Sequence, residues 1–91
     1  MQILDYNLVL TCECCPEQYD VFDSDGKKVG YLHLRYGGFR ADYPDRGGDT
    51  VYRYSFDDVM GRGTFDDDEE REKYLTEAVK AIHNRIELEK E

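Results

Sequence analysis

Apolar and polar residues alternate along much of the first half of the chain, and a period of two is typical of strands with one buried face. The alternation is clearest over residues 28–36. There Leu32 and Leu34 share one parity, while Tyr31, His33 and Arg35 share the other. The same pattern predicts strands over residues 2–14, 18–22, 28–36, 39–43 and 50–56.

Turn residues separate these runs. Pro16 ends the first strand, because proline cannot donate to a β-ladder. Asp25-Gly26 precedes a new apolar run and predicts a hairpin, since glycine adopts positive φ without strain. Gly37-Gly38 interrupts the next run, and Pro44 ends the predicted fourth strand.

The C-terminal part of the chain has the spacing of a helix instead. Asp66 can cap its N-terminus with Glu69 three residues later, and further acids there suit the positive end of the helix dipole. We therefore expect a helix over residues 66–88. Its apolar stripe follows i, i+3, i+4 spacing and consists of Leu75, Ala78, Val79, Ile82 and Ile86.

Together these elements predict a single α+β domain over residues 1–91. The fold class is an antiparallel β-meander of four to five strands with one C-terminal amphipathic helix packed on one face. The chain of 91 residues is small, so we expect its core to be modest.

Charge narrows the kinds of partner. The net charge is −9, and nucleic-acid binding draws on Lys and Arg, so direct nucleic-acid binding is not expected. Residues 26–56 depart from the rest, with six Lys or Arg against three acids. A protein partner with a basic surface would complement the acidic remainder of the chain, although solubility alone also accounts for the excess of acidic residues.

The densest carboxylate cluster surrounds the predicted helix start. It is a candidate surface for docking a basic partner. Helix capping with a solvated face, or a divalent-metal catalytic site, are alternatives. The residues assigned to partner binding here are Asp57, Asp58, Asp67, Asp68 and Glu70.

A second candidate surface is the polar parity of the third strand. Tyr31, His33 and Arg35 lie there, and Arg53 of the fifth strand could join them. Aromatic and arginine side chains are enriched where partners bind. The alternative is an ordinary solvated sheet face.

Cys12, Cys14 and Cys15 lie within four residues and cannot form a disulfide framework, which favours a reducing, cytoplasmic setting. They are candidate zinc ligands, with His33 or His83 as a fourth. Small buried residues or a catalytic thiol are the alternatives. We expect no cofactor. We also expect no membrane segment, since no apolar run approaches the length of a bilayer span.

Three stretches carry a resemblance to a protein group. They are Cys15-Pro-Glu-Gln-Tyr-Asp-Val-Phe, Gly30-Tyr-Leu-His-Leu-Arg and Phe39-Arg-Ala-Asp-Tyr-Pro-Asp. In these stretches the chain resembles small acidic proteins predicted in bacterial and prophage genomes. The resemblance implies a phage or mobile-element setting, where small acidic proteins often inhibit host defence systems.

No catalytic constellation is recognisable, so the leading hypothesis is a non-enzymatic protein-binding module. It would act through its acidic surface, as a phage-type inhibitor of a host nucleic-acid-handling or defence complex. The alternative is a domain that binds a small ligand or zinc, through the sheet face or the cysteine segment.

Overall fold

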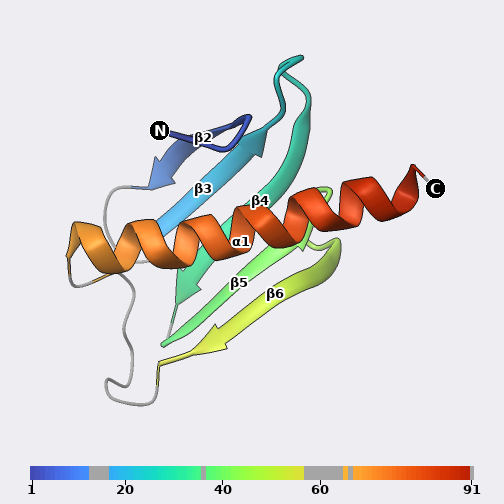
Figure 1. Ribbon diagram of the computed structural model, residues 1–91. Helices are drawn as coiled ribbons and strands as arrows, with labels where there is room; N and C mark the ends of the chain where they lie inside the picture. The colour runs from blue at the N-terminus through green and yellow to red at the C-terminus, as the bar shows by residue number, and fades with distance from the viewer. Residues whose placement is uncertain (13–16, 36, 57–64, 66, 91) are drawn as a thin grey trace.

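The computed structural model describes residues 1–12, 17–35, 37–56, 65 and 67–90. It contains one antiparallel sheet whose strands follow one another in chain order, from β1 to β6, and one long helix that crosses a single face of that sheet (Figure 1). The α+β class and the meander topology are therefore as predicted. The elements are β1 (Gln2–Ile3), β2 (Tyr6–Cys12), β3 (Glu17–Phe22), β4 (Lys28–Arg35), β5 (Gly38–Tyr43), β6 (Asp49–Ser55) and α1 (Asp68–Glu89).

The described sheet has six strands, not the four to five expected, because the first predicted strand is divided. The chain reverses at Leu4, whose φ of 55° lies in the left-handed region, and β1 folds back on β2. This reversal pairs Ile3 with Tyr6, and both side chains are buried. Burial of both side chains at the end of the sheet overrides the simple alternation. The expected extension beyond Cys12 lies outside the described residues.

The helix begins two residues later than predicted and is capped by a different aspartate. Asp67 is the N-cap, and its carboxylate accepts a hydrogen bond of 2.8 Å from the backbone N–H of Glu70. The expected cap, Asp66, lies outside the described residues. Capping needs an extended backbone just before the first helical turn, and Asp67 has it. Among the described elements, no helix is both long and apolar enough to cross a membrane.

The predicted apolar stripe of α1 packs on the sheet. Leu75, Ala78, Val79 and Ile82 are fully buried. The closest approach is at Gly30 of β4, where a β-carbon would lie 2.5 Å from Cδ1 of Ile82. Glycine at this position lets the helix lie against the strand.

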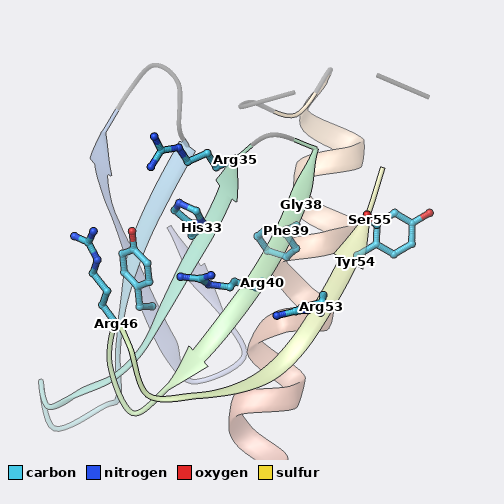
Figure 2. Close-up of a pocket in the computed structure, with 10 residues that line it drawn as sticks. His33, Arg35, Gly38, Phe39, Arg40, Arg46, Arg53, Tyr54 and Ser55 are labelled. Carbon is cyan, nitrogen blue, oxygen red and sulfur yellow. The ribbon is translucent and has the colours of Figure 1, made fainter. Parts of the chain in front are cut away.

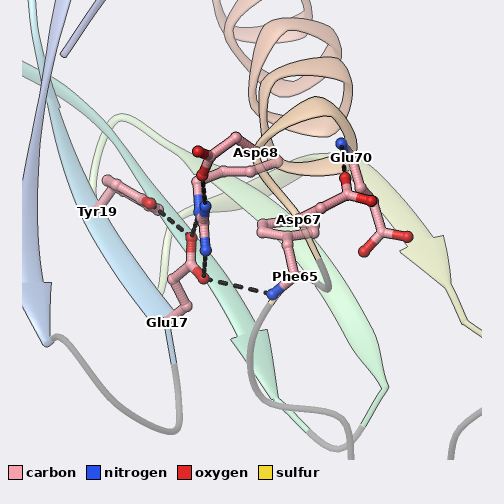
Figure 3. Close-up of polar contacts among 7 residues, drawn as sticks. Glu17, Tyr19, Phe65, Asp67, Asp68 and Glu70 are labelled. Atoms are coloured by element: carbon pink, nitrogen blue, oxygen red, sulfur yellow. Dashed lines mark hydrogen bonds and ion pairs between the residues drawn. The ribbon is translucent and has the colours of Figure 1, made fainter.

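An ion-pair network joins the N-terminal end of α1 to β3 (Figure 3). Glu17 is only 4% exposed and accepts a hydrogen bond of 2.5 Å from the Tyr19 hydroxyl and one of 2.8 Å from Nε of Arg71. It also accepts from the backbone N–H of Phe65 at 3.4 Å. Each oxygen of the buried carboxylate thus has a donor, as burial of a charge requires. The network fixes the start of α1 over one face of the sheet. Among the described elements none lies over the other face, which we call the uncovered face.

Candidate anion-binding site

The uncovered face of the sheet carries a row of polar side chains in exact register across four strands. Gln18 of β3 is the cross-strand partner of His33, His33 is the partner of Arg40 on β5, and Arg40 is the partner of Arg53 on β6. Directly paired residues in an antiparallel sheet point to the same face. Figure 2 shows the side chains of Arg40 and Arg53 on this side of the sheet, away from α1.

A hollow lies beside this row. Arg35 is paired with Gly38, and Gly38 is paired with Ser55, so the next row across the sheet has little side-chain volume at its centre. A β-carbon on Gly38 would meet nothing nearer than the Arg35 carbonyl oxygen at 3.6 Å, an ordinary contact. The lack of a side chain at Gly38 therefore leaves open space at a position where a larger residue would not clash.

The resulting concavity has a volume of about 510 Å³. We call it the arginine pocket. It is lined by Tyr31, His33, Arg35, Gly38, Phe39, Arg40, Arg46, Arg53, Tyr54 and Ser55 (Figure 2).

Arg46 comes from the loop between β5 and β6, and a buried carboxylate orders that loop. Asp42 is 2% exposed and accepts hydrogen bonds from the Gly47 backbone N–H at 3.3 Å and the Thr50 hydroxyl at 3.1 Å. The guanidinium of Arg46 then lies 5.8 Å from the centre of the Tyr31 ring, within cation–π range. The loop thereby adds a cation to the rim of the pocket.

Aromatic rings form one wall of the pocket. The rings of Tyr31 and His33 stack with centres 5.9 Å apart, and the Tyr31 hydroxyl donates to Oε1 of Gln18 at 2.6 Å. Tyr31 lines the pocket but is only 4% exposed, so little of its side chain is open to a partner. His33 is half-buried and faces the pocket.

The pocket is electropositive. Burial is the main reason that the pKa of His33 is lowered from its ordinary value, and the nearby charges of Arg40, Arg35 and Arg46 lower it further. Among the described residues that line the pocket, none is a carboxylate. The nearby Asp20 and Asp45 are ion-paired with Lys28, at 3.0 and 2.7 Å.

Arg40 and Arg53 are incompletely neutralised. Nε of Arg40 is buried and lies 3.5 Å from Asp42, yet it finds no hydrogen-bond partner in the described part of the chain. Arg53 has no carboxylate within ion-pair distance among the described residues. Guanidinium groups placed in this way can donate to the oxygens of an anion.

Three of the residues predicted for partner binding, Tyr31, His33 and Arg35, do meet in this pocket. Sequence reasoning did not assign Arg40, Arg46 or Gly38 to the site. The excess of basic residues in segment 26–56 was the available signal, since every arginine of the pocket lies within it.

The acidic cluster lies on α1, which crosses the opposite face of the sheet. Asp67 caps the helix, and Asp68 forms an ion pair with Arg71 across one helical turn. Asp57 and Asp58 lie outside the described residues, and partner binding by Asp67 and Asp68 stays a prediction. Partner binding by Glu70 stays a prediction.

The zinc hypothesis is not tested by the described residues. Cys14, Cys15 and the side chain of Cys12 lie outside them, and the remaining described residues contain no group of three or more potential ligands. His83 bonds to the Tyr6 hydroxyl through Nδ1 at 2.8 Å. Tyr6 and Cys12 begin and end β2.

Comparisons with protein-family models, with curated proteins and with solved structures found no match for this chain. The assignment of function therefore depends on the geometry and charge of the site.

Proposed function

We propose that this chain is a non-enzymatic binding module that holds an anionic ligand in the arginine pocket on the uncovered face of its sheet. The observation that carries the proposal is the direct pairing of Arg40 with Arg53 in the middle of that face. Like charges directly opposite one another destabilise a sheet, whereas opposite charges contribute roughly 0.2–1 kcal/mol.

The composition of the chain strengthens the argument from the pairing of Arg40 with Arg53. The chain has 21 acidic residues against 12 Lys and Arg, so acids are plentiful as partners for arginine. The fold nevertheless gathers four arginines around one hollow, and Asp42, which lies 3.5 Å from Nε of Arg40, is not among the described residues that line it. A bound anion would offset the repulsion between the arginines, because each guanidinium could donate hydrogen bonds to it.

The proposed ligand is negatively charged, whereas the sequence led us to expect a positively charged protein partner. That expectation and the phage-inhibitor setting remain predictions. The pocket supports the small-ligand alternative without a metal ion. Tyr31, His33 and Arg35 keep a place in the site under this proposal, with Arg40, Arg46 and Arg53 added.

A nuclear magnetic resonance titration tests the proposal. Isotope-labelled protein is titrated with pyrophosphate, with citrate and with a glutamate-rich peptide, and backbone amide shifts are followed. At least one of these anions should cause saturable shifts centred on residues 33–40 and 53–55.

The variant Arg40→Gln/Arg53→Gln should lose these shifts. Lys80→Gln/Arg85→Gln removes the same charge from α1 and should retain them. If none of the three anions produces saturable shifts at these residues, or if the two variants respond alike, the proposal is wrong.

A further inference from the structure

We infer that the ligand of the arginine pocket is a phosphorylated small molecule of about nucleotide size, with its phosphates among the arginines and a planar ring against His33. This inference rests on the proposed function, because it names the class of anion that the pocket accepts.

The number of donors indicates a phosphate over a single carboxylate. A carboxylate has two oxygens and one charge, and a single guanidinium fork satisfies it. A phosphate monoester carries about −1.5 to −2 charges and three strong acceptor oxygens. Four arginines, from β4, β5, β6 and the loop before β6, line this hollow. An anion with several oxygens and more than one charge matches that supply of donors.

The volume indicates more than a lone phosphate. Small-molecule sites usually enclose about 300–1,000 Å³, and the pocket of about 510 Å³ falls within that range. Because Gly38 and Ser55 provide a low floor next to the paired arginines, there is room for a second group beside the phosphates. The ligand therefore carries a substituent as well as its charge.

The wall indicates the shape of this second group. His33 is half-buried, lines the hollow and is backed by the stacked ring of Tyr31. A supported flat ring offers a stacking surface for a planar group, and guanidinium planes stack on such groups as well. A nucleobase is a planar group of suitable size.

The charge of the whole chain indicates a compact ligand instead of a nucleic-acid strand. Affinity for a strand rises with the number of its phosphates that Lys and Arg neutralise. Outside this hollow the chain is strongly acidic, with a net charge of −9 overall. A polymer leaving the pocket would meet repulsion, whereas a nucleotide keeps its charge inside.

Titration calorimetry with adenosine diphosphate, pyrophosphate, adenosine, citrate and a single-stranded uridine octamer tests the inference. Adenosine diphosphate should bind at least about tenfold more tightly than citrate or the octamer, a difference of about 1.4 kcal/mol. It should also bind more tightly than pyrophosphate, and adenosine alone should bind more weakly than either.

Two variants divide the site into its parts. Gly38→Val places side-chain volume in the hollow at a position where a β-carbon makes only an ordinary contact, and it should weaken adenosine diphosphate more than pyrophosphate. His33→Ala should reduce the advantage of adenosine diphosphate over pyrophosphate and leave pyrophosphate affinity within about threefold. Circular dichroism and thermal melts of each variant test whether the fold is kept.

The outcomes separate this inference from the proposed function. If citrate binds the pocket as tightly as adenosine diphosphate, the phosphate class is wrong while anion binding stands. If the octamer binds more tightly, the compact ligand is wrong. Equal affinities for adenosine diphosphate and pyrophosphate overturn the ring contact. If no anion binds, both the inference and the proposed function fail.

Discussion

Arg53 lies directly opposite Arg40 in the register of β5 and β6, and no described carboxylate pairs with it. If the role of Arg53 is to bind an anion, this residue should lower the stability of the ligand-free protein. We predict that Arg53→Gln raises the free energy of unfolding by about 0.2–1 kcal/mol, because a like-charge pair is removed. Urea unfolding of both proteins in a buffer without multivalent anions measures the difference. A decrease of similar size would mean that Arg53 has a structural role.

His33 should report the electrostatic field of the arginine pocket. Burial and then Arg40, Arg35 and Arg46 lower its pKa, and Asp42 opposes them. As pH falls below about 6.5, the unfolded chain therefore takes up this proton before the folded one, and the His33 contribution to stability is lost. Gln18 on β3 and Tyr31 on its own strand are the neutral groups beside the ring.

We predict that Arg40→Gln raises the pKa of His33 toward its ordinary value, and that saturating pyrophosphate raises it in the wild type. The first change removes a positive neighbour, and the second adds a negative one. Proton resonances of the His33 ring, followed against pH, give both values. An unchanged titration curve in the presence of bound pyrophosphate would place the anion elsewhere.

At the scale of elements, α1 and the sheet meet at Gly30 and Ile82. We predict that Gly30→Ala lowers the free energy of unfolding by about 1–3 kcal/mol through overpacking. Ile82→Val removes the Cδ1 atom that the new methyl group would meet and costs about 0.5–1.5 kcal/mol alone. The double variant should lose clearly less than the sum, by at least about 0.5 kcal/mol. Additive losses in urea unfolding would contradict this packing.

The ion pair between Glu17 and Arg71 at the start of α1 leads to a second prediction at this scale. Arg71→Met leaves the buried carboxylate of Glu17 without its cation and should cost about 3 kcal/mol. Arg71 is a quarter exposed, so water compensates for part of the loss. Adding Glu17→Gln should recover part of the stability, because the unpaired charge is removed. Equal melting temperatures for the single and the double variant would show that this charge is not costly.

Much of this architecture follows from the sequence because its signals are local. Alternation and Asp25-Gly26 predict the hairpin of β3 and β4, and the carboxylate of Asp23 stabilises it by accepting from the Asp25 and Lys27 backbone N–H groups. The reversal at Leu4 was missed because a leucine at positive φ has no sequence signature. Its reason is tertiary, namely the burial of Ile3 at the end of the sheet.

The site was only partly predictable for a similar reason. Parity along one strand places His33 and Arg35 on the same face, but only the register between strands brings Arg40 and Arg53 together. Arg46 lies in a loop whose position depends on hydrogen bonds to the buried Asp42, a contact between residues that no local pattern reveals.

At the scale of the whole molecule, charge is divided between the two faces of the sheet. The acidic residues that begin α1 lie on the covered side, and the arginine pocket lies on the other. The field of the whole chain is negative at a distance, while the pocket is positive locally. Such a distribution favours small anions that enter the hollow over large ones that also approach the acidic surface.

The most direct test of anion binding is a calorimetric titration of pyrophosphate into three proteins at the same ionic strength. These are the wild type, Arg40→Gln/Arg53→Gln, and the control Lys80→Gln/Arg85→Gln, which loses the same charge from α1. The arginine pocket predicts one site in the wild type, affinity within about threefold in the control, and at least about a tenfold loss in the pocket variant, a difference of about 1.4 kcal/mol. Equal affinity in the two variants, or no binding by the wild type, would contradict it.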